Sequence, residues 1–250
     1  MLRAPVPSLR AMRRLVVMVA AATVAMITVN GANADASQSA TSPNWDGYVA
    51  VGGPFREVQA QWTIPSLDCS PSTTLDGYSI AFSWVGLDDD DTVEQGGVIS
   101  ECSLGVEDNW LFWEMWPNAA HEYPLAGIGG AGDHIAASVR YVGRSGLYEI
   151  TVTDTTTKTQ LKAAEPCPSG SLCVRSAAEV ITEGNSSEDN LGDYGAMTYT
   201  RIEVTNGTRT KPIGWWDPVA VTQEDSGVVK ATVSPLEKNG SEFTAKWEHL

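Results

Sequence analysis

Basic residues are scarce in this 250-residue chain, which holds 16 Lys plus Arg against 31 Asp plus Glu and has a formal net charge of −15. Four of them, Arg3, Arg10, Arg13 and Arg14, precede every acidic residue, and without them the net charge would be −19. A surface with this much negative charge repels phosphate backbones, so we expect no nucleic-acid partner. Protonation of carboxylates would relieve the self-repulsion, which favours an acidic working environment.

The side chains most used as nucleophiles and metal ligands are also few. Of three histidines, His121 begins an HExxH-like string with Glu122, but residue 125 is Leu, and no GxSxG or P-loop motif occurs. The acidic run 88–91 could bind calcium, although such runs are usually solvated. We therefore expect no metal and no organic cofactor. Chemistry would rest on carboxylates, amides or aromatic hydroxyls, as in acid peptidases and glycosidases.

Only four cysteines are present, and none forms the Cys-x-x-Cys pair of a typical zinc site. Two disulfides are favoured instead, which suits an oxidising compartment. Three pairings are open in principle. Cys167 and Cys173 bracket the turn sequence PSGSL, which can close a small ring, and Cys69 and Cys102 then pair by default.

The N-terminus has the pattern of an export signal. A basic segment precedes the apolar run Leu15–Val29, and Ala32-Asn33-Ala34 supplies a small-x-small cleavage site. Residues 1–34 are therefore predicted to be a signal peptide of a secreted, extracellular protein. The alternative is a membrane anchor, for which the run is short. After a loose lead-in at 35–43, residues 44–250 are expected to form a single domain.

Strand-like segments follow one another with turns between them. They are rich in Val, Ile, Thr, Tyr and Trp, many alternate, and no helical stripe occurs beyond the leader. Such a series predicts an all-β sandwich or barrel of antiparallel sheets. The expected strands are 47–52, 57–65, 78–87, 93–101, 109–117, 134–143, 147–155, 158–164, 176–183, 196–206, 212–222, 228–235 and 242–249.

Alternation along four of these segments groups acidic, amide and aromatic side chains, because successive strand residues point to opposite faces. The residues that share a face are Trp110, Phe112, Glu114 and Trp116; Phe82, Trp84 and Gly86; Val93, Gln95 and Gly97; and Ala177, Glu179, Ile181 and Glu183. A carboxylate among aromatics is costly in a closed core. We interpret these faces as the floor of a ligand cleft, the alternative being ordinary packing of the nine tryptophans.

Six strings resemble, in order and spacing, the glutamic peptidases (eqolisins). They are NWDGY (44–48), SWVGLD (83–88), VEQGGV (93–98), FWEMWP (112–117), YPLAGI (123–128) and SAAEVITE (176–183). The likeness covers residues 43–235. It implies a secreted, pepstatin-insensitive endopeptidase that is active in acid. It also implies an antiparallel β-sandwich of concanavalin or lectin type, with two packed sheets of about seven strands each.

The resemblance also implies roles for single residues. Gln95 and Glu179 match the catalytic Gln and Glu of the family, although Gly96 replaces a Thr and Val180 replaces a Trp beside them. The other matches are Trp45 and Trp84 to tryptophans of the cleft, Asp88 and Glu114 to supporting acids, and 118–129 to a flap. Trp116, on the Glu114 face, joins the expected substrate-binding and supporting residues.

A Gln and a Glu can together hydrolyse a peptide bond. With a reference pKa of about 4.3, Glu179 would be partly ionised near pH 4, could take a proton from water and could return it to the leaving amine. The amide of Gln95 could stabilise the oxyanion and hold the water. Because an amide does not titrate, a single deprotonation would switch activity on.

Two other functions are compatible with the same residues. A glycoside hydrolase would use Glu114 and Glu179 as its acid pair. A non-catalytic carbohydrate-binding module would need only the aromatic face. The peptidase interpretation predicts polypeptide substrates, no membrane partner once the leader is removed, and a monomer.

Overall fold

Strands account for nearly all the regular structure. The computed structural model describes residues 38–70, 77–88, 91–124, 130–185 and 190–249, so the predicted signal peptide lies outside the described residues. The elements are β1 Gln38–Ser42, β2 Trp45–Val51, β3 Phe55–Thr63, β4 Ser79–Asp88, β5 Val93–Ser103, β6 Val106–Trp116, β7 His121–Pro124, β8 His134–Val142, β9 Leu147–Asp154, β10 Thr159–Pro166, β11 Ala177–Glu183, β12 Ala196–Asn206, β13 Arg209–Pro212, the 3₁₀ helix η2 Ile213–Trp215, β14 Pro218–Asp225, β15 Val228–Val233 and β16 Phe243–Trp247. In this part of the chain, no helix has the length and apolar character needed to cross a membrane.

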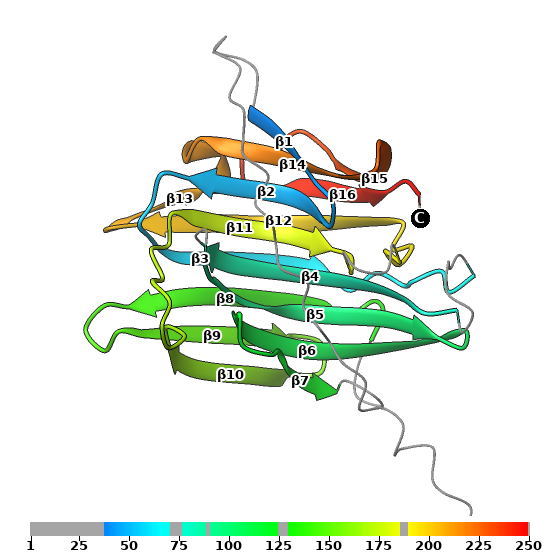
Figure 1. Ribbon diagram of the computed structural model, residues 1–250, viewed down its shortest axis with the longest axis horizontal. Coiled ribbons are helices and arrows are strands. Elements are labelled where there is room, and N and C mark those ends of the chain that lie inside the picture. Colours follow the sequence, from blue (N-terminus) through cyan, green and yellow to red (C-terminus); the bar gives the residue numbers. More distant parts are fainter. Residues whose placement is uncertain (1–37, 71–76, 89–90, 125–129, 186–189, 250) are drawn as a thin grey trace, which may run out of the picture.

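The strands form one continuous sheet that folds over on itself (Figure 1). Its order is β10-β9-β8-β3-β12-β16-β15-β14-β2-β11-β4-β5-β6-β7, with β13 beside β12 and β1 parallel to β14. Strand β12 pairs with β16 over residues 196–199 and with β3 from Thr200 onward, with a register shift before Glu203. The all-β antiparallel sandwich is confirmed. The expected division into two sheets of about seven strands is wrong, because β12 belongs to both layers.

The front layer consists of β2, β11, β4, β5, β6 and β7, and the back layer of β12, β3, β8, β9 and β10 packs behind it (Figure 1). Strand β4 lies against β3 and β8, and β5 lies against β8 and β9. Apolar residues that alternate along both layers fill the space between them and form the main core. They include Val58, Ala60, Trp62, Ile135, Val139, Ile150 and Val152 from the back layer, and Val85, Leu87, Val98, Leu111, Met115 and Val180 from the front layer.

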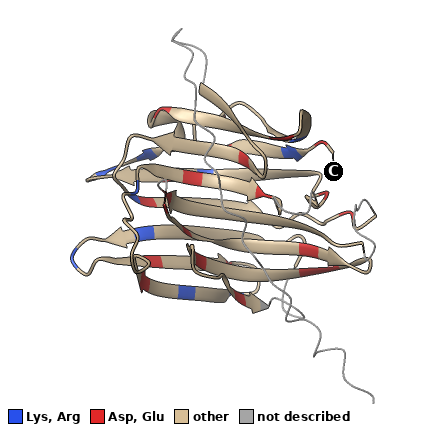
Figure 2. Ribbon diagram, viewed as in Figure 1, with Lys and Arg blue, Asp and Glu red and all other residues tan. Residues whose placement is uncertain are grey.

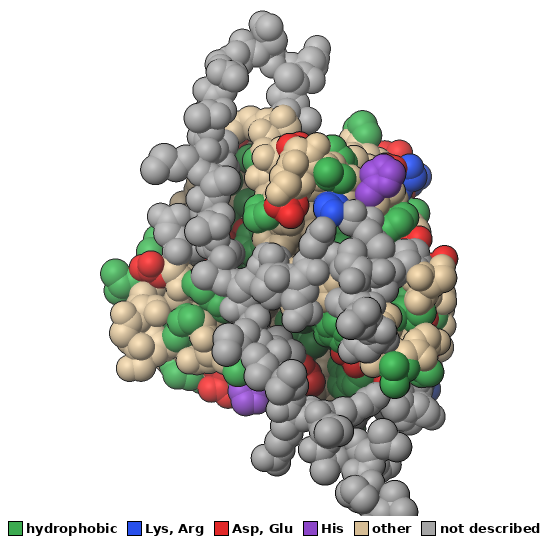
Figure 3. All heavy atoms as spheres, turned by 45° about the vertical axis from the view of Figure 1, so that its right-hand side comes forward, with side chains coloured by type: hydrophobic (Ala, Val, Ile, Leu, Met, Phe, Trp, Pro, Cys, Tyr) green, Lys and Arg blue, Asp and Glu red, His purple; other side chains and the backbone are tan. Residues whose placement is uncertain are grey.

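The other face of the front layer carries a second apolar cluster. Its buried members are Trp45, Ile80, Trp84, Val93, Ile99, Phe112, Ile181 and Val221. On this side of the molecule, apolar side chains share the described surface with acidic ones (Figure 3). The front layer therefore carries apolar side chains on both faces, and only one of these faces joins the layers.

Four short segments, β1, β7, β13 and η2, differ from the sequence expectation, and the disulfides agree with it. Gln38–Ser42, inside the expected loose lead-in, forms β1 and pairs with β14. The expected strand 212–222 begins only at Pro218, because Ile213–Trp215 forms η2. The disulfides join Cys69 to Cys102 and Cys167 to Cys173, the pairs expected from the spacing.

Candidate active site

One cross-strand row of the front layer holds both residues of the expected dyad. Glu179 on β11, Gly86 on β4, Gln95 on β5 and Glu114 on β6 stand directly opposite one another. Directly opposed residues share a face, and neighbouring strands are roughly 4.8 Å apart, so the Cα atoms of Glu179 and Gln95 are roughly 10 Å apart. Because Gly86 has no side chain, nothing from its own position fills the space between the Glu and the Gln.

The neighbouring rows contain the remaining expected site residues. Asp88 lies opposite Ala177 on β11 and Val93 on β5, and Val93 lies opposite Trp116. On the other side of the row, Trp84 lies between Ile181 and Gly97. Trp45 is opposite Glu183, one row further along. The front layer thus gathers all seven expected site residues on one face.

The two departures from the family strings point away from this face. Gly96 comes directly after Gln95, and Val180 comes directly after Glu179. Successive strand residues point to opposite faces, so both side-chain positions face the back layer. Val180 is fully buried in the main core. A Cβ on Gly96 would lie 2.5 Å from Ile150 Cγ2 on β9, so only glycine lets β5 pack this closely on the back layer. Both departures therefore belong to the packing of the layers.

Gln95 and Glu114 form a buried hydrogen-bonded pair. Gln95 Nε2 donates to Glu114 Oε2 at 2.9 Å, and the two residues are 4% and 3% exposed. Burial, and secondly the charge of Glu183, raises the pKa of Glu114 to about 8. Gln95 Oε1 and Glu114 Oε1 are buried and have no hydrogen-bond partner among the described residues. The pair is therefore fixed on one side and has unused polar atoms on the other.

Glu179 lies in an environment that favours its neutral form. Burial raises its pKa well above the ordinary value, and contact with Asp88 contributes in the same direction through repulsion and a hydrogen bond. The charges of Glu183 and Glu94 add to this effect. The assumption that Glu179 titrates near 4.3 is therefore wrong for the folded protein. Its Oε2 is buried without a partner among the described residues.

The front layer offers these acids no cation from its own strands. The front-layer strands β2, β11, β4, β5, β6 and β7 contain no Lys or Arg, and neither does β14, the neighbour of β2 (Figure 2). Without a nearby positive charge, burial is not offset by ion pairing. Burial is therefore the main cause of the raised pKa values of Glu114 and Glu179, and repulsion from neighbouring acids adds to it.

Sequence reasoning did not include Glu183 and Asn44 in the site. Glu183 Oε1 accepts from Asn44 Nδ2 at 2.9 Å, and Glu183 Oε2 accepts from Trp84 Nε1 at 3.0 Å. Burial raises the pKa of Glu183 to about 7, while the hydrogen bonds from Trp84 and Asn44 lower it in part. Alternation in 176–183 had already put Glu183 on the face of Glu179, which was the available signal.

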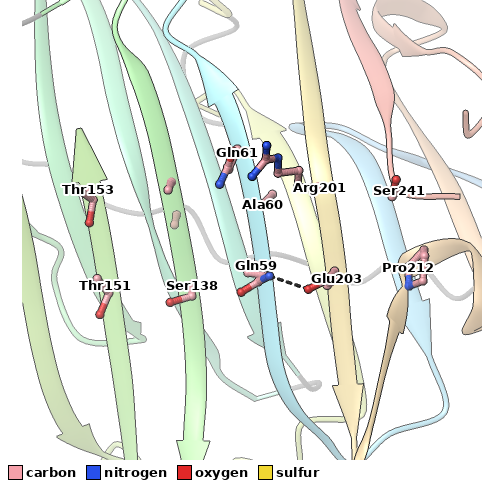
Figure 4. A pocket seen from close by; sticks show the side chains of 12 residues that line it. Gln59, Ala60, Gln61, Ser138, Thr151, Thr153, Arg201, Glu203, Pro212 and Ser241 are labelled. Atoms are coloured by element: carbon pink, nitrogen blue, oxygen red, sulfur yellow. Dashed lines mark hydrogen bonds between the residues drawn. The ribbon is translucent and has the colours of Figure 1, made fainter. Parts of the chain in front are cut away.

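A groove of about 530 Å³ lies elsewhere, on the outer face of the back layer (Figure 4). Gln59, Gln61, Arg201 and Glu203 are among its polar lining residues, and Gln59 Nε2 donates to Glu203 Oε2 at 2.7 Å. None of the expected site residues lines it. Its side chains are those of a solvated sheet face, and they serve below as matched controls.

Comparison with known proteins identifies the family and the fold. Residues 43–246 match the Peptidase A4 family. Aspergillopepsin-2 of Aspergillus niger is 27% identical over 224 residues, which is 81% of this chain and 73% of that protein. The structure of scytalido-glutamic peptidase with a transition-state analogue inhibitor has a TM-score of 0.65 and 22% identity, covering 82% of this chain and 98% of that one.

The structure of aspergilloglutamic peptidase from Aspergillus niger has a TM-score of 0.57 and 24% identity, covering 68% of this chain and 99% of the other. At such identities the structural likeness shows a shared fold. The family match spans most of the sequence, and the chain therefore belongs to the Peptidase A4 family and is a glutamic-type peptidase.

Proposed function

We propose that this protein is a secreted, pepstatin-insensitive endopeptidase that hydrolyses polypeptides in acid, with Glu179 and Gln95 as its catalytic residues. The cross-strand row carries the proposal, because it sets the two side chains on one face, with Gly86 at the strand position between them. A peptide that crosses the front layer there would have its scissile bond between a carboxyl group and an amide. The two disulfides support an oxidising, extracellular destination.

Glu179 activates the water. Its ionised carboxylate takes one proton from a water molecule, and the resulting hydroxide attacks the carbonyl carbon of the scissile bond. The C–N bond of the tetrahedral intermediate then breaks, and the proton held by Glu179 passes to the leaving amine. Peptide and water are converted to a carboxylic acid and an amine, and Glu179 returns to its starting form.

Gln95 stabilises the charge that develops on the carbonyl oxygen. Its Nε2 has two hydrogens, of which one is given to Glu114 Oε2. The second is available to the oxyanion, and Oε1 can accept from the attacking water. Because Glu114 has a pKa of about 8, it is neutral in acid and holds the amide without placing a negative charge beside the oxyanion.

Asp88 reconciles a raised pKa of Glu179 with activity in acid. Two carboxyl groups in contact lose their protons in two steps, and repulsion raises mainly the second. The pair formed by Asp88 and Glu179 would therefore hold one proton and one negative charge over a range of acidic pH. The hydrogen bond raises the pKa of Glu179, so the shared proton lies mainly on Glu179 and the charge on Asp88. Glu179 acts as the base in the form in which that proton has moved to Asp88.

The alternative functions receive no such support. Glu114 and Glu179 are separated by β4 and β5, and Gln95 lies between them and bonds to Glu114, so they do not face each other as a glycosidase acid pair does. A carbohydrate-binding module would not need the buried Gln95–Glu114 pair. We accordingly keep the peptidase as the proposal, acting as a monomer on polypeptide substrates.

Casein digestion by point variants tests the proposal. We expect Glu179→Gln to lower kcat/KM by at least about a thousandfold and Gln95→Ala by about a hundredfold or more, with pepstatin and EDTA without effect on the wild type. Gln61→Ala and Glu203→Gln, which change the same residue types in the back-layer groove, should keep wild-type activity. Full activity of either Glu179→Gln or Gln95→Ala would refute the assignment.

A further inference from the structure

Glu183 is a carboxyl group that the proposed reaction does not use. It lies on the face of Glu179, four residues further along β11 and so roughly 13 Å away, too far to touch a substrate bond held by Glu179. Both of its oxygens accept hydrogen bonds from neutral N–H donors, those of Asn44 and Trp84. A carboxyl group suits this place because each of its oxygens can accept.

Trp84 connects Glu183 to the row that contains the dyad. Its indole nitrogen is anchored to Glu183, and the ring reaches back along β4 toward Gly86. A Cβ on Gly86 would lie 2.8 Å from Trp84 Cζ3 and 3.2 Å from Cε3, so the six-membered ring covers Gly86. Gly86 is the position between Glu179 and Gln95. The indole therefore runs from Glu183 to the floor of the space between the two catalytic side chains.

The orientation of this ring has few other polar restraints. Trp84 is fully buried, and Trp45 packs against it edge to face, with ring centroids 5.3 Å apart and planes at 79°. Such packing fixes where the ring lies, but it supplies no partner for the indole N–H. The hydrogen bond from Nε1 to Glu183 selects one orientation, the one that lays the benzo edge across Gly86.

We propose that Glu183 is a positioning residue, which holds the Trp84 indole across Gly86 and so fixes the floor of the space between Glu179 and Gln95. The inference rests on the proposed function, since it concerns the same site. A floor that shifts by a fraction of an ångström displaces the carbonyl carbon relative to the water, which lowers kcat more than it weakens binding. Asn44 completes the arrangement by holding the second oxygen of Glu183.

The test is a double-mutant cycle of Glu183→Gln and Trp84→Phe, with kcat and KM measured on a peptide substrate in acid. Glu183→Gln should lower kcat about tenfold while KM changes by less than about threefold. Trp84→Phe keeps a ring but removes the donor, so adding Glu183→Gln to it should lower kcat by less than about twofold more. Asp46→Asn, a change in a buried carboxyl that faces the other layer, is the control and should leave kcat unchanged.

Wild-type kcat in Glu183→Gln, multiplying effects in the double variant, or an equal loss in Asp46→Asn would each overturn the inference. If Glu183→Gln does not fold, Trp84→Phe and Asn44→Ala decide, since each removes one of the two hydrogen bonds to Glu183. Lower kcat at an unchanged melting temperature supports the role, and wild-type kcat in both refutes it. The double-mutant cycle is interpreted only if the wild type cleaves the substrate and the Glu179→Gln variant does not. Failure of the proposed function would appear in those two proteins first.

Discussion

Asp88 decides how the pH dependence of the site differs from that of a single carboxylate. Repulsion and a hydrogen bond between Asp88 and Glu179 favour a shared proton. The pH profile of kcat/KM should therefore have two limbs: a rise as the pair loses its first proton, and a fall as it loses the second. Asp88→Asn removes one titrating group and one negative charge, so the pKa of Glu179 should fall and the limb that belongs to the Asp88–Glu179 pair should disappear. The remaining loss of activity at high pH should follow the ionisation of Glu114, whose pKa is about 8.

The measurement is kcat/KM between pH 2 and pH 8 for the wild type and Asp88→Asn. Glu203→Gln in the back-layer groove serves as a control for the loss of one acidic residue. An Asp88→Asn profile with the wild-type shape would mean that Asp88 does not share a proton with Glu179. The wild-type profile alone also tests the simpler expectation from the sequence, in which a single deprotonation of Glu179 switches activity on and Asp88 plays no part.

At the scale of single residues, alternation predicted which side chains share a face, but not how they are solvated. Gln95 and Glu179 could be placed together because strand period and family strings agree. The raised pKa values of Glu114 and Glu179 could not be predicted, since burial depends on segments distant in sequence. Glu183 was on the predicted face, but its contact with Trp84 depends on which strands are neighbours.

At the scale of elements, the register of β11, β4 and β5 makes Gly86 the gap in the catalytic row. Gly86→Ala would put a methyl group 2.8 Å from the Trp84 ring, so the ring must shift. We expect kcat/KM to fall at least about tenfold while the fold is kept. Gly143→Ala is the control, because its added Cβ meets only Tyr141 at 3.6 Å. Equal activity of the two variants would contradict a role for the gap.

Strands with a buried alternating pattern were predicted well, and short strands at sheet margins were not. β1 has the polar sequence QSATS, while β7 and β13 have four residues each and end in proline, so none shows the period-two pattern of a half-buried strand. The path of β12 through both layers depends on a register shift near Thr200. Such a register shift depends on which strands become neighbours in the folded sheet. The sequence therefore predicts a β-sandwich, but not that one continuous sheet forms both of its layers.

At the scale of the whole molecule, buried acids should make the fold more stable in acid than near neutrality. Folding raises the pKa of Asp46, Glu114, Glu179 and Glu183, with Glu183 reaching about 7 and Glu114 about 8. A group with a raised folded pKa binds its proton more tightly in the native state. Its contribution is complete below the unfolded pKa, near 4, and is lost as the pH rises through the folded value.

Urea unfolding from pH 3 to pH 9 should therefore show a midpoint that falls with rising pH, mainly between pH 4 and pH 8. Asp46 isolates one contribution, because it is fully buried and accepts from Tyr194. Asp46→Asn keeps an acceptor but cannot ionise, so it should lower the free energy of unfolding by about 1 kcal/mol or less in acid and make its pH dependence shallower.

Repulsion among the exposed charges also grows with pH, but salt screens it over about 10 Å at 0.1 M, whereas buried groups are screened much less. The fall should therefore persist in 0.5 M salt, and a midpoint independent of pH there would show that these carboxyls are not buried in the folded protein.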